Sequence, residues 1–248
     1  MTYQTARAIL QTAAASVPDS IGTRTMVKGS VDARVKALGV SVCFARLTGF
    51  QVENKNDKVR TLKREIAAAI KDRWDDRRLA SEPRLAGYRD LYDRVGAGAE
   101  KIVPSCEGLI RTVKRTGGFP TINSIVDLYC CVSALHLVTM GAHDASRIEG
   151  ELRVSITTGR ERFIPLGSHL ESAVRPGEYA YMDDRDILCR LDVKQCNKTK
   201  ITLATSEVIL VANSHEHIPI EDLRSACEHL CEIARRLLGA EAEILAVV

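Results

Sequence analysis

The sequence lacks the features that mark several large classes of protein. No run of apolar residues reaches the ~20 that a membrane-spanning helix needs, and no two cysteines have the CxxC spacing of zinc sites. No secretory signal is recognisable at the start of the chain. We therefore expect a cytoplasmic protein without a membrane span, a metal or another cofactor, whose eight cysteines are reduced thiols.

Common catalytic and nucleotide-binding patterns are missing as well. No Ser-His-Asp arrangement can be read from the spacing of these residues, and His215 and His217 have no third metal ligand at a recognisable distance. The Gly-Ala-Gly tripeptide at 96–98 follows a helical stretch, whereas a dinucleotide-binding loop must follow a strand. These absences argue against a serine hydrolase, a histidine metal site and a Rossmann fold.

The composition is that of an ordinary globular protein with a mild positive charge. Of 248 residues, 45% are hydrophobic and 27% are charged, and the formal net charge is +3. A net charge of this size does not by itself indicate a nucleic-acid partner. Basic residues outnumber acidic ones between residues 55 and 115, so we expect any phosphate contact there, although a solvated helix face with opposite-charge pairs is the favoured interpretation.

Hydrophobic periodicity predicts helices in the first half of the chain, short strands in the second and a helix at the end. The helical spacing of apolar residues predicts four helices, at 59–74, 84–95, 106–115 and 219–238. Ser105 is a good cap for the third helix, and a β-branched run at 38–52 predicts a strand or strand pair. After Asp144, turn residues separate six short strand-like runs: ELRVSI, ERFIPL, EYAYMD, DILCRLDV, KITLAT and EVILVAN.

This order of elements predicts an α+β fold with a mostly antiparallel sheet, closed by the C-terminal helix. We expect one domain over residues 36–248, preceded by a helical appendage over residues 1–35 that is stopped by Pro18. Within the domain, Asn123 and Asp127 lie four residues apart in an apolar stretch, so a helix would place both on one face. An unpaired buried polar group costs roughly 1 to 3 kcal/mol, so both must find partners, and we expect a pocket wall there.

Six segments carry a resemblance to a known family: PSCEGLIRTVKR, FPTINSIVDLYCCVSALH, GAHDASRIEGELRV, TGRERFIPL, EYAYMDDRD and KITLATSEVILVAN. In this order and spacing they resemble the editing and tRNA-binding module, the B3/B4 domain, of the phenylalanyl-tRNA synthetase beta subunit. They are more closely similar to free-standing relatives of that module, and the likeness covers about residues 85–238. The resemblance implies aminoacylated tRNA as the partner, and a cleft that, in the synthetase, hydrolyses the ester between a wrong amino acid and its tRNA.

The resemblance also points to site residues. Asn123 and Asp127 match the family's Asn and Asp in the segment that enters the pocket wall, and Asp144 and Gly150 match the Asp and Gly that follow. Two positions depart from the family pattern. Gly141 stands where the synthetase has a histidine, and the segment 192–195 has no glycine where the synthetase has a Gly-Gly turn.

Hydrolysis of an aminoacyl ester needs a positioned water and a polarised carbonyl. We therefore predict His143 and Asp127 as the catalytic residues, with His143 orienting the water. The predicted substrate-binding residues are Asn123, Asp144, Arg190, Thr202 and Thr205. Each has a structural alternative: His143 as a loop histidine, Asp127 as an internal hydrogen-bond partner, and Arg190 as an exposed strand residue.

Three functions remain open at this point. The favoured one is trans-acting hydrolysis of mischarged aminoacyl-tRNA. The second is a tRNA-binding or adaptor protein that has lost the chemistry, which Gly141 and the missing Gly-Gly turn would explain. The third is an amino-acid-binding protein that uses the cleft alone. The sequence does not fix the amino acid, the tRNA or the oligomeric state.

Overall fold

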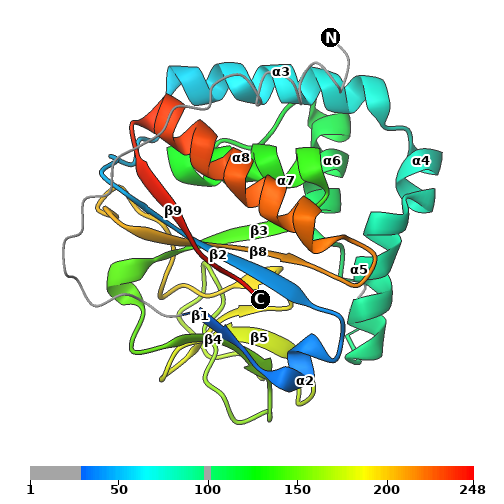
Figure 1. The fold of residues 1–248 in the computed structure, drawn as a ribbon, viewed down its shortest axis with the longest axis vertical. Helices are drawn as coiled ribbons and strands as arrows, with labels where there is room; N and C mark the ends of the chain where they lie inside the picture. Colours follow the sequence, from blue (N-terminus) through cyan, green and yellow to red (C-terminus); the bar gives the residue numbers. More distant parts are fainter. Residues whose placement is uncertain (1–28, 98–101) are drawn as a thin grey trace.

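The computed structural model describes residues 29–97 and 102–248 and arranges them in three layers (Figure 1). A layer of helices covers one face of a four-stranded sheet, and a five-stranded sheet lies on the other side of that sheet. Side chains from strands of both sheets line a common internal cavity, so the two sheets face each other. The predicted α+β class is confirmed.

The four-stranded sheet has the order β3-β8-β2-β9, and all its neighbouring strands are antiparallel. Its strands are β2 (Ser41–Thr48), β3 (Thr139–Asp144), β8 (Val208–Ser214) and β9 (Glu241–Val247). The predicted strand at 38–52 is thus confirmed. By contrast, β3 and β9 were not predicted. Strand β9 follows the last helix, and pairing with β8 fixes the conformation of β3.

The five-stranded sheet has the order β1-β4-β5-β6-β7. Its strands are β1 (Gly29–Val31), β4 (Leu152–Ile156), β5 (Tyr179–Met182), β6 (Ile187–Arg190) and β7 (Lys194–Gln195). Only the β1–β4 pair is parallel. The predicted strands ERFIPL and KITLAT are wrong: the first makes isolated bridges at Arg162 and Pro165, and the second is a loop in which threonine side chains bond to the backbone.

Helix α7 (Ser124–His136) lies at the centre of the helical layer. It packs against the helices α3 (Asp57–Arg73), α6 (Ser105–Thr116) and α8 (Ile220–Leu238) and against β3. Twelve of its thirteen residues are buried, as expected for a helix that is covered on all sides. Any polar side chain on α7 must therefore find its partners inside the protein.

The remaining helices are short or peripheral: α2 (Ala33–Lys36), α4 (Asp76–Ser81), α5 (Pro83–Arg94) and the 3₁₀ helix η2 (Ala145–Arg147). The four predicted helices correspond to α3, α5, α6 and α8. The predicted Ser105 cap is wrong, because Pro104 occupies the cap position of α6 and the Ser105 hydroxyl has no hydrogen-bond partner in the described part of the chain. Pro104 has the fixed φ that suits a helix entry.

The N-terminal boundary stays a prediction. The helix expected before Pro18 lies outside the described residues, and Gly29–Val31, which the prediction assigned to the appendage, pairs with β4. Among residues 29–97 and 102–248, no helix combines the length and the apolar character that crossing a membrane requires.

Candidate functional site

Asn123 and Asp127 stabilise the beginning of helix α7. Asn123 is its N-cap, and its side-chain oxygen accepts a hydrogen bond from Val126 N at 3.0 Å. Asn123 Nδ2 also donates to Ile201 O at 3.5 Å, which joins the helix to the 199–205 loop. Asp127 Oδ1 accepts from Ile122 N at 2.9 Å. Both side chains are therefore part of the internal hydrogen-bond network of the fold.

Asp127 forms a buried ion pair with Lys63 of helix α3. The distance from Lys63 Nζ to Asp127 Oδ2 is 2.6 Å, and the two side chains are only 8% and 7% exposed. Lys63 Nζ also donates to Pro120 O at 2.7 Å and to Thr121 Oγ1 at 2.9 Å. The ammonium group thus has three oxygen partners and links α3, α7 and the loop before α7.

His143 lies on β3, between the two sheets, with 1% of its surface exposed. Its Nδ1 is 2.8 Å from Thr199 Oγ1, which in turn is 3.2 Å from Cys196 Sγ. Burial lowers the pKa of His143 from 6.5 to about 4, so the imidazole is neutral near pH 7. His143 Nε2 is buried and has no hydrogen-bond partner among the described residues.

Asp144, Thr202 and Thr205 form one cluster. Asp144 caps η2 by accepting from Ser146 N at 3.0 Å, and its second oxygen accepts from Thr205 Oγ1 at 2.6 Å. Thr205 Oγ1 also accepts from Thr202 N at 3.0 Å. Since Asp144 N donates to Thr199 O at 3.0 Å, the 199–205 loop is held against the end of β3.

Arg190 forms a second buried ion pair. Its guanidinium donates to both carboxylate oxygens of Glu178 at 2.8 Å, the bidentate geometry that carboxylates favour. It also lies 5.7 Å from the centroid of the Phe163 ring. Arg190 is 4% exposed, so it is a buried residue of β6 and not an exposed strand residue.

The structure therefore brings five of the seven predicted site residues to one loop. Around the 199–205 loop lie Asn123, His143, Asp144, Thr202 and Thr205. Asp127 and Arg190 instead belong to two separate ion pairs. None of the seven lines the pocket of about 470 Å³ that opens beside Cys196. Their catalytic and binding roles stay predictions.

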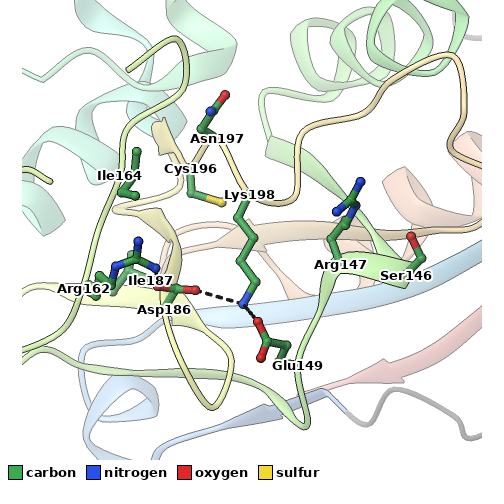
Figure 2. A pocket seen from close by; sticks show the side chains of 10 residues that line it. All are labelled: Ser146, Arg147, Glu149, Arg162, Ile164, Asp186, Ile187, Cys196, Asn197 and Lys198. Carbon is green, nitrogen blue, oxygen red and sulfur yellow. Dashed lines mark hydrogen bonds and ion pairs between the residues drawn. The ribbon is translucent and has the colours of Figure 1, made fainter. Parts of the chain in front are cut away.

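That pocket has a volume of about 470 Å³ and lies where the chain passes from β3 of one sheet to β4 of the other. We call it the Lys198 pocket. Its lining residues come from four segments: Ser146, Arg147, Glu149, Arg162, Ile164, Asp186, Ile187, Cys196, Asn197 and Lys198. Figure 2 shows Lys198 between Asp186 and Glu149, with Arg147 and Arg162 on opposite sides of it. A volume of this size suits a small-molecule ligand or a terminal nucleotide.

Lys198 forms ion pairs with three carboxylates at the pocket. Its Nζ lies 2.7 Å from Glu149, 2.7 Å from Asp183 and 2.9 Å from Asp186. Burial alone would lower the pKa of Lys198, but the hydrogen bonds that its ammonium donates to these three carboxylates outweigh burial and raise the pKa above that of a free lysine. The ammonium therefore stays charged at physiological pH.

Arg147 is one of two exposed arginines that line the pocket, the other being Arg162. Arg147 belongs to η2, and no carboxylate partner is recorded for it among the described residues, whereas Arg162 pairs with Glu171 and Asp186. A guanidinium in this position can bind a phosphate or carboxylate group. None of the residues that line this pocket was predicted as a site residue from the sequence. Asn197-Lys198 reads only as a turn between strand-like runs.

The described residues offer no metal centre. No group of three or more His, Cys, Asp or Glu side chains in residues 29–97 and 102–248 is arranged to hold a metal ion. All eight cysteines are free thiols and buried. The polar groups that line the pocket include ammonium, guanidinium, carboxylate, amide and thiol groups.

Comparisons with known proteins identify the family. The model of the B3/4 domain family matches residues 87–236, which include every residue that lines the Lys198 pocket. An N-terminal fragment of the phenylalanyl-tRNA synthetase beta subunit from Pyrococcus horikoshii aligns with 92% of this chain at 13% identity and a TM-score of 0.48, and the alignment covers 53% of that fragment. No curated protein was found to match. Since the family model covers more than half of it, the chain belongs to the B3/4 domain family.

Proposed function

We propose that the Lys198 pocket binds the aminoacylated 3′ end of a tRNA and that the protein hydrolyses the ester of a mischarged tRNA in trans. Membership of the B3/4 domain family supports an editing or tRNA-binding role. The observation that carries the proposal is the exposed guanidinium of Arg147, which lines a pocket of about 470 Å³. The other two cations of the pocket, Lys198 and Arg162, are already paired with carboxylates.

The pocket has the groups that ester hydrolysis needs. In our proposal Arg147 binds a phosphate of the terminal nucleotides, and Ile164 contacts the apolar part of the aminoacyl group. In this step Glu149 releases Lys198, and the freed N–H of the Lys198 ammonium polarises the ester carbonyl. The Glu149 side chain, which is 55% exposed, accepts a proton from the attacking water. The acyl–oxygen bond then breaks and the ribose hydroxyl leaves with a proton.

In this proposal the residues predicted from the sequence do not contact the substrate; they hold the residues that line the pocket in position. His143 contacts Thr199, which contacts Cys196 of the pocket, so His143 is a positioning residue for Cys196. Asp144 is a positioning residue as well, because it caps η2, which contains Arg147. The others hold the surrounding elements in place: Asn123, Asp127, Arg190, Thr202 and Thr205.

A second candidate function is tRNA or amino-acid binding without hydrolysis. A specific observation favours it: the two side chains predicted to be catalytic are buried, His143 against Thr199 and Asp127 against Lys63. If Glu149 is held permanently by Lys198, the pocket has a ligand-binding site but no general base.

The decisive experiment is to incubate the protein with a panel of tRNAs, each charged with a non-cognate amino acid, and to follow loss of the ester. We expect loss above the spontaneous rate for at least one of them, and a marked reduction in Arg147→Ala and Glu149→Gln. Arg224→Ala is the matched control, because Arg224 is an exposed arginine that does not line the pocket.

The outcomes separate the two functions. Salt-dependent tRNA binding without turnover would favour the non-catalytic alternative. Stabilisation by a free amino acid but not by tRNA would point to an amino-acid-binding protein. Equal loss of activity in the Arg147 and Arg224 variants would show that the Lys198 pocket is not the site.

A further inference from the structure

A second, much smaller cavity lies between the two sheets. Its volume is about 10 Å³, which is room for about one water molecule. Residues of both sheets line it, among them Gly141 and His143 of β3, Tyr181 of β5 and Val211 of β8. Asp192 also lines it, so a titratable carboxyl and an imidazole face the same enclosed space.

His143, which lines this cavity, has a nitrogen without a hydrogen-bond partner among the described residues. Its Nδ1 is bonded to Thr199 Oγ1, whereas Nε2 is buried and has no partner among the described residues. If Nδ1 carries the proton, Nε2 is an acceptor that lacks a donor. If Nε2 carries the proton, it is a donor that lacks an acceptor. Either tautomer leaves one polar atom unpaired in the core, which is costly.

Asp192, which also lines the cavity, has four polar side chains bonded to its carboxylate. Its carboxylate accepts hydrogen bonds from Tyr92 Oη at 2.6 Å, Thr139 Oγ1 at 2.8 Å and Tyr179 Oη at 3.1 Å, and from the amide of Asn213. Asn213 lines the cavity as well, and its amide oxygen accepts from Tyr181 Oη at 2.9 Å. The cavity is therefore polar enough to hold water.

We propose that this cavity holds one water molecule bonded to His143 Nε2, and that the water joins His143 to the hydrogen-bond network of Asp192. Water fits the space and satisfies either tautomer, because it both donates and accepts. With the water in place, a continuous path runs from Cys196 in the Lys198 pocket through Thr199, His143 and the water to Asp192. A proton taken up at the pocket can reach a buried carboxyl along it. This inference does not depend on the proposed function.

Gly141→Ala tests for the water. A Cβ at Gly141 would meet only Val211 Cγ2, at 3.6 Å, so the methyl group itself fits. If the cavity holds water, the methyl displaces it, leaves His143 Nε2 unpaired and lowers Tm. If the cavity is dry, the methyl fills a void in a strand and raises Tm, which would overturn the proposal.

The matched control is Gly108→Ala in helix α6, where an added Cβ meets nothing within 4 Å. We expect this variant to raise Tm, because alanine is the better helix former. The control shows that the melting assay detects the gain that a dry cavity would give to Gly141→Ala.

Two direct measurements complete the test. A crystal structure that resolves internal waters should show density within hydrogen-bond distance of His143 Nε2, and an empty cavity there would contradict the proposal. In ¹⁵N spectra of the His143 ring, Asp192→Asn should shift Nε2 more than Nδ1. An unchanged Nε2 would show that the water does not join His143 to Asp192.

Discussion

The N-terminus of helix α7 and the Lys198 pocket both bring a lysine together with carboxylates, but they differ in what remains available to a ligand. At α7, Lys63 and Asp127 are almost fully buried and all their recorded partners are internal. In the pocket, Lys198 is 22% exposed and Glu149 is 55% exposed, and Arg147 beside them is exposed. A polar side chain in an apolar segment therefore does not by itself mark a site, because it can be a structural pair.

The largest effect should come from breaking the buried pair. We expect Lys63→Met to lower the free energy of unfolding by about 3 to 5 kcal/mol, because it leaves the Asp127 carboxylate buried without its cation. The measurement is urea denaturation at pH 7. The control is Arg60→Ala on the same helix, whose pair with Asp57 is exposed and should contribute little.

Removing both charges of the pair tests whether the unpaired carboxylate causes the loss of stability. A double variant, Lys63→Met with Asp127→Leu, should recover much of the lost stability, because no charge is then left unpaired. If Lys63→Met were as stable as Arg60→Ala, the pair at α7 would not be structural, and Asp127 would again be a candidate for catalysis.

The next largest effects are on the pH dependence of folding stability. Burial raises the pKa of Asp192 from 3.8 to about 6, although four hydrogen bonds oppose the rise. The folded state then binds a proton that the unfolded state has lost, so this residue's contribution to stability falls as the pH rises from about 4 to about 6. His143 acts in the opposite direction. Its pKa is lowered from 6.5 to about 4, so its contribution is lost as the pH falls through that range.

The two contributions oppose each other in the wild type, and single variants should separate them. Relative to wild type, Asp192→Asn should lose stability as the pH falls from about 6.5 to about 4, and His143→Phe should lose it as the pH rises across that range. Each change should be about 3 kcal/mol at most, from 1.36 kcal/mol per unit of pKa. Chemical denaturation at several pH values measures it. Parallel curves for the two variants would contradict the assignment.

The parts of the fold that the sequence predicts are those with a local signal. Helices α3 and α8 follow from apolar spacing, and α8 ends at Gly239, which adopts the expected left-handed conformation. Strand β3 could not be predicted, because Thr139–Asp144 has no apolar alternation and depends on pairing with β8, where Thr139 meets Asn213, 74 positions further along the chain.

The candidate site was still harder to predict. The Lys198 pocket is assembled from residues 146–149, 162–164, 186–187 and 196–198, which the two sheets bring together. Each segment alone reads as a charged turn or as part of a short strand. Asn123 and Asp127 are polar residues in an apolar stretch. This pattern correctly predicted that both side chains form hydrogen bonds inside the protein.

A smaller effect is expected at the pocket itself. Arg147→Ala should weaken binding of aminoacylated tRNA by about tenfold, which corresponds to ~1.4 kcal/mol for a lost charge-assisted contact. It should also reduce the salt dependence of binding. Arg224→Ala should change neither. Filter binding at several salt concentrations measures both, and equal effects of the two variants would remove the distinction between the pocket and the general surface.

The smallest effect separates a cap from a substrate ligand at Asn123. Asn123→Ala should cost about 1 kcal/mol of stability, because α7 loses its N-cap. Asn123→Ser keeps an oxygen that can accept from Val126 N, but it lacks the amide that donates to Ile201 O. If Asn123 is structural, the serine variant should recover most of the stability and of the tRNA binding. If Asn123 contacts substrate through its amide, serine should restore Tm while binding stays weak, and Asn123 would then belong with the pocket residues.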